Sequence, residues 1–225
     1  MTVKANRGLT AIFGRMMLAT CAAAVLGTSL TGCFPLLAGG AIAGGALVAT
    51  DRRTSGAQLE DEGIELRAMS RLRDNVGSRA RVSVTSYNRQ VLLTGEVLNE
   101  QDKKLVEQVV SRVENVASVV NELAIINSPS LVQRTSDVLI TGQVKAMFVD
   151  AKDLYANSFK VVTERGTVYL MGRVTQREAD RATEIVRGAR GVQKVVRILE
   201  IISEDEMRSL LLTQPKPAPA EAAPR

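Results

Sequence analysis

Histidine and tryptophan are absent from this chain of 225 residues, and only two cysteines occur in it. Without histidine, the chain lacks the side chain that most often performs general acid–base catalysis near neutral pH. The usual zinc-ligand sets are excluded for the same reason. The sequence also contains no nucleophile paired with a base, no metal-ligand cluster and no phosphate-binding loop. We therefore predict that the protein is not an enzyme.

Acidic residues are missing from the first fifty positions, whereas Lys4, Arg7 and Arg15 lie near the N-terminus. An apolar run follows at Met16–Leu30. It is about fifteen residues long, which is shorter than the ~20 residues that a membrane-spanning helix needs. A basic start followed by a short apolar run is typical of a secretory signal peptide.

One of the two cysteines ends this region, in the sequence Leu30-Thr31-Gly32-Cys33. This motif resembles the bacterial lipobox, which implies cleavage before Cys33 and acyl chains such as palmitate on the new N-terminal residue. The alternative is an uncleaved anchor with an incidental cysteine. Phe34 takes the place where lipoproteins kept in the inner membrane typically carry Asp, so we expect a lipid-anchored protein on the periplasmic face of the outer membrane. No cofactor is predicted beyond the covalent lipid on Cys33.

The positive charge of the chain comes largely from the signal region. Residues 1–32 contain three of the 29 basic residues and none of the 24 acidic ones, so the mature chain has 26 basic and 24 acidic residues, a net charge of +2. This balance gives no reason to expect nucleic acid as a partner. The apolar, Gly-rich residues 34–50 read as a tether at the lipid interface, and a second membrane segment is the alternative. The Pro/Ala-rich end at 213–225 reads as a tail.

Two segments, 82–97 and 159–174, share the pattern Val-x-Leu-x-Gly-x-Val at an offset of 77 residues. Matching apolar positions continue downstream at an offset of 76, so two copies of a unit of about 65 residues are present. Each copy predicts the order αββαβ, with short polar turns at Asn88-Arg89 and Arg165-Gly166. Thr175-x-x-Glu178 predicts a capping box at the start of the second helix of the second copy. We therefore predict an α+β fold, in which two helices pack on a three-stranded sheet in each copy. Gly95 and Gly172 occupy equivalent strand positions, which indicates a close backbone approach there.

The glycine-marked strands, together with Gly191-Val192-x-x-Val195, resemble the BON domain. The first copy departs from the motif at Asn115, although asparagine also tolerates positive φ. A lipobox followed by two such units resembles the dual BON-domain outer-membrane lipoproteins. The resemblance implies a non-catalytic role in envelope integrity, connected with division sites, and contact of the first helix of the second domain with anionic phospholipid. The predicted divisions are a signal peptide (1–32), a lipidated tether (33–58), BON domain 1 (59–127), BON domain 2 (134–203) and a Pro/Ala-rich C-terminal tail (204–225).

The helix that the resemblance singles out is predicted to run from Ser136, as its cap, to about Lys152. Ile140, Val144 and Phe148 form its core face at a spacing of four residues. A second stripe lies away from this face and suits a membrane surface, because lysines attract anionic headgroups and valines enter the acyl boundary. The predicted phospholipid-binding residues are Val138, Leu139, Lys145, Val149 and Lys152.

The first copy serves as an internal control, because Glu62 and Gly63 are the counterparts of Val138 and Leu139. The acidic run at 60–62 reads as a solvated helix start. Two alternatives to lipid binding stay open for Val138 and Leu139. They could pack against the first copy, or the stripe could dock on an outer-membrane assembly or quality-control protein.

Overall fold

The computed structural model describes residues 51–126 and 131–213, which lie in one compact unit. Cys33, the predicted signal peptide, positions 34–50 of the predicted tether and positions 214–225 lie outside the described residues.

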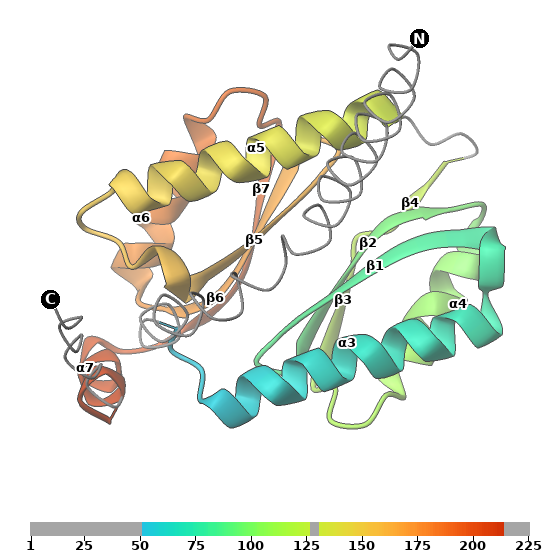
Figure 1. The fold of residues 1–225 in the computed structure, drawn as a ribbon, viewed down its shortest axis with the longest axis horizontal. Coiled ribbons are helices and arrows are strands. Elements are labelled where there is room, and N and C mark those ends of the chain that lie inside the picture. Colours follow the sequence, from blue (N-terminus) through green and yellow to red (C-terminus); the bar gives the residue numbers. More distant parts are fainter. Residues whose placement is uncertain (1–50, 127–130, 214–225) are drawn as a thin grey trace, which may run out of the picture. The chain divides into compact units, whose positions relative to one another are not determined.

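The first repeat has the predicted order, and its last strand is divided into two short pieces. β1 pairs antiparallel with β2, and both β3 and β4 pair parallel with β2, so β1 forms one edge of the sheet. The helices α3 and α4 cover one face of this sheet (Figure 1). The elements are α3 (Ser55–Asn75), β1 (Ala80–Tyr87), β2 (Gln90–Val97), α4 (Glu100–Ser111), β3 (Ser118–Asn121) and β4 (Ala124–Ile125).

The second repeat has the same topology with an undivided last strand. β6 is central, with β5 antiparallel on one side and β7 parallel on the other. The helices α5 and α6 cover one face of the sheet (Figure 1). The predicted α+β fold with two αββαβ domains is therefore confirmed. The elements are α5 (Leu131–Asp150), β5 (Phe159–Glu164), β6 (Thr167–Val174), α6 (Gln176–Arg187) and β7 (Lys194–Ile201).

Local sequence explains where these elements start and turn. Thr175 and Glu178 form the predicted capping box at the start of α6. Both hairpins turn through pairs of residues with positive φ, Asn88 and Arg89 in one repeat, Arg165 and Gly166 in the other. Two consecutive residues with φ above zero are the requirement of a type I′ turn, which matches the twist of a two-residue hairpin.

Each domain has its own hydrophobic core between its helices and its sheet. In the second domain, Ile140, Val144 and Phe148 of α5 lie in this core, as the spacing predicted. Ile64, Ala68 and Leu72 take the same role in α3. Because these residues fix which face of each helix is buried, they also fix which face points away from the sheet.

The sheet faces that carry no helices form a third cluster of buried residues, drawn from both domains. Val120, Val162 and Val196 pack against it. The two domains are thus joined by sheet-to-sheet packing, which leaves the helices on the outer sides. The buried members of this cluster are Tyr87, Leu92, Tyr169, Met171 and Ile198.

The structure differs from the sequence prediction at several element boundaries. α5 begins at Leu131, five residues before the expected cap Ser136. α3 begins at Ser55 after its cap Thr54, inside the stretch predicted as tether. A helix, α7 (Glu204–Thr213), occupies the start of the stretch predicted as tail. Acidic residues fill the first turn of α7, where the helix dipole favours negative charge.

Candidate functional site

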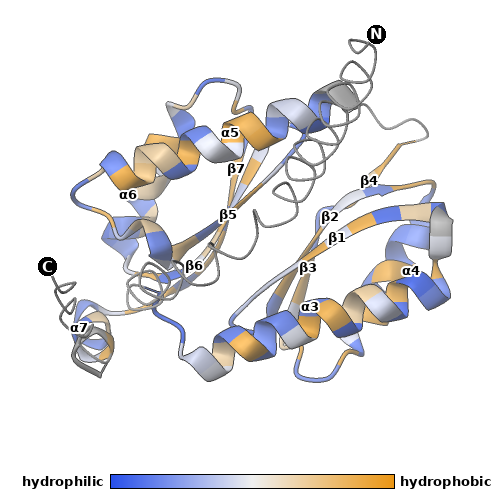
Figure 2. Ribbon diagram, viewed as in Figure 1, coloured by the Kyte–Doolittle hydropathy of each residue, from blue (hydrophilic) through white to orange (hydrophobic). Residues whose placement is uncertain are grey.

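The face of α5 that points away from its sheet is apolar and exposed. Val138, Leu139 and Val149 are 71%, 70% and 73% exposed. Lys145 is exposed between them, and the sequence from Val138 to Val149 contains no acidic residue. Gly142 is also exposed on this face, and because glycine has no side chain it adds no polar group to the surface. Figure 2 shows the hydrophobic stretches along α5 between its hydrophilic ones.

Most of the predicted binding residues lie together on this face, but Lys152 does not. Val138, Lys145 and Val149 follow one another at helical spacings of seven and four residues, and Leu139 flanks them. α5 ends at Asp150, and Lys152 lies exposed in the turn that follows. The helix stops there because Leu154 turns back into the core, with its backbone N–H bonded to the carbonyl oxygen of Ala151. The prediction that α5 runs through Lys152 was wrong.

Val138 and Leu139 are 71% and 70% exposed, so the first domain covers at most a small part of either residue. Val138 borders a hollow of about 300 Å³ whose charged lining includes Arg81, Arg134 and Glu164. The guanidinium of Arg81 lies 3.0 Å from the carboxylate of Glu164. That part of the hollow is therefore internally paired and offers little net charge to a ligand.

Sequence reasoning missed an apolar surface on α3. Leu59 and Leu66 are 69% and 72% exposed, and Met69 is 40% exposed. All three lie off the buried stripe of α3, so their spacing of seven and three residues was a usable signal. The counterparts of Val138 and Lys145 in this helix are Glu62 and Met69, and the counterpart of Val149 is Arg73. The charges on the outward face of α3 are therefore arranged differently from those on α5.

The prediction that Asp61 belongs to a solvated helix start was wrong, because this residue is 1% exposed. Its carboxylate accepts hydrogen bonds from the backbone N–H groups of Asn88 and Arg89, at 2.7 and 2.8 Å, and from the hydroxyl of Ser86 at 2.6 Å. Burial alone would raise the pKa of Asp61, but these hydrogen bonds and one from Arg53 lower it. The carboxylate thus ties α3 to the hairpin turn.

Asp137 repeats this arrangement in the second domain, where it accepts hydrogen bonds from the backbone N–H groups of Arg165 and Gly166 at 2.7 and 2.8 Å. The two aspartates are 76 residues apart, which is also the offset between corresponding helix residues of the two sequence copies. This recurrence was the signal that could have separated Asp61 from its exposed neighbours.

The residues just before α3 are held by both domains. Arg52 is 2% exposed and forms two hydrogen bonds of 2.7 Å with the carboxylate of Glu178 at the start of α6. The next residue, Arg53, contacts Asp61 at 2.8 Å and lies 4.2 Å above the ring of Tyr87 in the first domain. The end of the predicted tether is therefore built into the folded unit.

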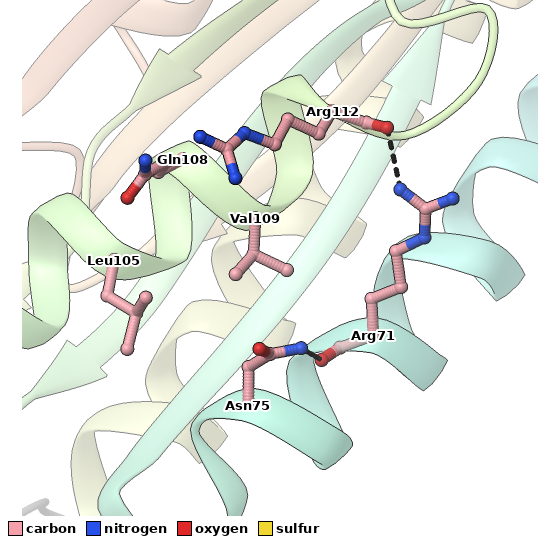
Figure 3. A pocket seen from close by; sticks show the side chains of 6 residues that line it. All are labelled: Arg71, Asn75, Leu105, Gln108, Val109 and Arg112. Carbon is pink, nitrogen blue, oxygen red and sulfur yellow. Dashed lines mark hydrogen bonds between the residues drawn. The ribbon is translucent and has the colours of Figure 1, made fainter.

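A separate hollow of about 210 Å³ lies between α3 and α4 (Figure 3). Arg71 donates to the backbone carbonyl oxygen of Arg112, at 2.6 Å, and Asn75 donates to the carbonyl oxygen of Arg71, at 2.7 Å. Figure 3 shows the Arg71 guanidinium directed at the carbonyl oxygen of Arg112. These side chains satisfy groups at helix ends, which need partners in any fold. The hollow is explained by helix capping.

Within the ranges 51–126 and 131–213, no group of three or more Cys, Asp and Glu side chains could hold a metal ion. Over the same ranges, none of the helices combines the length and the apolar character that crossing a bilayer requires.

Comparison with known proteins agrees with the two-domain architecture. The family model of the BON domain matches residues 60–127 and 136–202. Outer membrane lipoprotein DolP of Haemophilus influenzae is 36% identical over 206 residues, which covers 90% of this chain and 100% of the relative. A protein of Actinobacillus pleuropneumoniae named 21 kDa hemolysin is 30% identical over 154 residues, covering 68% of this chain and 79% of the relative.

Among solved structures, CdsD, a structural protein of the type III secretion system of Chlamydia trachomatis, is similar at 15% identity with a TM-score of 0.27. The match covers 67% of this chain and 98% of that one. A similarity at this level supports no conclusion about function.

The chain belongs to the BON-domain family. Its similarity along the whole length of a named relative shows that it is an outer-membrane lipoprotein with two BON domains, and the predicted localisation is confirmed.

Proposed function

We propose that this lipoprotein binds anionic phospholipid through the outward face of α5, while acyl chains on Cys33 anchor it to the outer membrane. The observation that carries the proposal is the exposure of Val138, Leu139 and Val149 on one helix face beside Lys145. Exposed apolar residues on a contiguous face mark interaction surfaces. A role in envelope integrity, connected with division sites and without catalysis, belongs to the same proposal and rests on the family.

The two attachments have different tasks. Acyl chains on Cys33 give stable anchoring, because two or more lipid chains hold a protein at a membrane. α5 therefore need not supply attachment, and it selects where the tethered protein dwells. A lysine near an anionic leaflet contributes about 1 kcal/mol, so the contact is weak. It also depends on salt, because charges are screened over about 8 Å at physiological ionic strength.

The test is an NMR titration of the protein without Cys33, using anionic and zwitterionic micelles. We expect shifts at α5 with anionic micelles, and we expect the double variant Val138→Glu with Lys145→Glu to lose them while keeping its fold. The matched control is Met69→Glu, which changes the position in α3 that corresponds to Lys145. This control should bind micelles like the wild type.

Equal binding of anionic micelles by the double variant and the wild type would place the lipid surface elsewhere. The exposed face of α5 would then be a contact for a protein, such as a component of outer-membrane assembly.

A further inference from the structure

α3 presents an apolar surface that the lipid function of α5 does not use. Leu59, Leu66 and Met69 are 69%, 72% and 40% exposed on one side of the helix, while Ile64 and Ala68 fill the core from the other. A single exposed leucine needs no explanation, but several on one helix face form a contact surface. Figure 2 shows hydrophobic stretches along α3 that alternate with hydrophilic ones.

The charges beside this surface differ from those on α5. Glu62 takes the position of Val138, and Glu65 takes the position of Thr141. Where α5 combines apolar residues with a lysine, α3 carries these two carboxylates beside Leu66 and Met69, and Arg73 follows near the end of the helix. An anionic bilayer surface repels carboxylates, whereas a cationic polypeptide is attracted by them.

A groove of about 450 Å³ runs between this side of α3 and the edge strand β1. The described residues that line it include two carboxylates and no basic side chain. Glu62 is exposed and has no hydrogen bond or ion pair within the part of the chain that the structure describes. The lining consists of Glu62, Glu65, Leu66, Met69, Val82, Ser83 and Val84.

The edge strand β1, which forms one wall of this groove, has backbone groups that are available for hydrogen bonding. β1 pairs with β2 alone, so its other edge has no strand partner within the described residues. Tyr87 and Gln90 flank the two-residue turn and form a hydrogen-bonded pair, so the alternation along the strand turns the N–H and C=O groups of Val82 and Val84 to the free edge. Ser86 confirms this direction, because its N–H donates to Glu65 at 2.7 Å.

A lysine of the second domain already makes the contact that a cationic ligand would make. The ammonium of Lys160 donates to the carbonyl oxygen of Ser86 at 3.1 Å and to the carboxylate of Glu65 at 2.8 Å. It thus bridges the edge of β1 and a carboxylate of α3. At Val82–Val84 of the same edge, no described side chain takes this role.

We propose that the groove between α3 and β1 binds an extended, cationic segment of another polypeptide. The segment adds to the edge of β1 through the backbone groups of Val82 and Val84, as in other cases of strand addition. Its apolar side chains contact Leu66 and Met69, and its Lys or Arg side chains pair with Glu62. This surface lies on a different helix from the proposed lipid surface, so the two proposals stand or fall separately.

The probe is a fluorescent octapeptide that alternates threonine with valine in its middle and lysine at its ends. The titrated protein is the full lipidated chain in nanodiscs of zwitterionic lipid. We expect saturable binding, and we expect Glu62→Lys and Leu66→Ser each to weaken it about tenfold, which corresponds to about 1.4 kcal/mol. Both residues are exposed, so the fold should persist.

Val149→Ser is the matched control, since Val149 is as exposed as Leu66 but lies on α5. It should leave peptide binding unchanged. Hydrogen exchange should also slow at the amides of Val82 and Val84 when the peptide is added. The proposal is overturned if the peptide does not bind, or if both groove variants bind it like the wild type. It is also overturned if Leu66→Ser instead lowers binding to anionic vesicles, because α3 would then be a lipid surface.

Discussion

Gly172 in β6 leaves no room for a side chain. A Cβ atom there would lie 2.5 Å from the carbonyl oxygen of Ser158, and this backbone atom cannot move aside as a flexible side chain could. Gly95 is in the same situation in β2, since its Cβ would lie 2.0 Å from the carbonyl oxygen of Arg81. The repeated strand glycine is thus required by the close approach of neighbouring backbone.

We predict that Gly172→Val lowers the free energy of unfolding by more than about 1 kcal/mol, because the added atoms overpack a fixed backbone contact. The measurement is thermal unfolding followed by circular dichroism. Gly142→Ala is the control, since no atom lies within 4 Å of a Cβ at this helical position. This change should raise stability by about 0.5–1 kcal/mol. An unchanged midpoint for Gly172→Val would show that the strand tolerates a side chain.

Asp61 gives a prediction for acid stability. Its pKa is lower in the folded protein than in the unfolded chain, so its contribution is present above the unfolded value of about 4 and is lost as the pH falls through the folded value. Asp61→Asn should cost about 2 kcal/mol at neutral pH, the scale of hydrogen bonds to a charged group. The variant should then lose less further stability than the wild type below about pH 4.

Urea denaturation at several pH values measures this difference. Asp74→Asn changes an exposed carboxyl of the same helix and serves as the control. It should show the acid sensitivity of the wild type. If Asp61→Asn and the wild type lose stability in parallel below pH 4, the buried carboxylate does not govern the acid response.

At the scale of the elements, α3 and α5 have the same place in their domains but different outward surfaces. Both bury the i, i+4, i+8 stripe, and both use an aspartate to hold the hairpin turn. They differ at positions that the fold does not constrain, where α3 has Glu62 and Met69 and α5 has Val138 and Lys145. The two helices therefore share their buried stripe and their contact with the turn, and they differ in the residues that they expose.

Local patterns predicted the features that local geometry decides. The turn at Asn88-Arg89 was predicted as a short polar link between two β-rich runs, and the structure has it there, with positive φ at both residues. Asn115 has φ of 67°, as expected where the repeat motif has glycine. The cap of α6 was predicted because Thr175 and Glu178 are three residues apart and bond to each other's backbone.

Features that depend on distant contacts were not predicted. The partner of Arg52 is 126 residues away, and no local pattern connects it with Glu178. Lys152 was placed on α5 because the helical period gives no end point, whereas the actual end is set by the burial of Leu154 in the core. The exposed side of α3 was overlooked because Glu62 and Gly63 interrupt its apolar residues.

At the scale of the whole folded unit, two adjacent arginines connect the chain before α3 to both domains. Arg53 pairs with Asp61 in the first domain, and Arg52 pairs with Glu178 in the second. Arg52 also donates to the carbonyl oxygen of Arg173 at 3.1 Å. The sheet-to-sheet cluster joins the same two domains through apolar contacts. Arg52 and Arg53, the residues just before α3, are thus fastened to both domains.

The pair of Arg52 and Glu178 should therefore matter for the stability of the unit. Both side chains are almost completely buried, at 1% and 0% exposed. Burial alone would raise the pKa of Glu178, but the hydrogen bonds from Arg52 lower it, so the carboxylate depends on its partner to stay charged. Arg52→Ala leaves a buried charge without its counterion, and we predict a loss of about 3–5 kcal/mol in the free energy of unfolding.

Denaturant unfolding of the variants distinguishes a buried pair from a surface one. Arg177→Ala is the control, because Arg177 is 3.9 Å from Glu204 and both side chains are about half exposed. Exposed pairs contribute little, so this variant should stay close to the wild type. The double variant Arg52→Met with Glu178→Leu removes both charges and should recover most of the loss, since apolar residues of similar volume can replace a buried ion pair. If Arg52→Ala is as stable as the Arg177→Ala control, the contact of Arg52 with Glu178 does not hold the chain before α3 in the folded unit. The folded unit would then begin at α3.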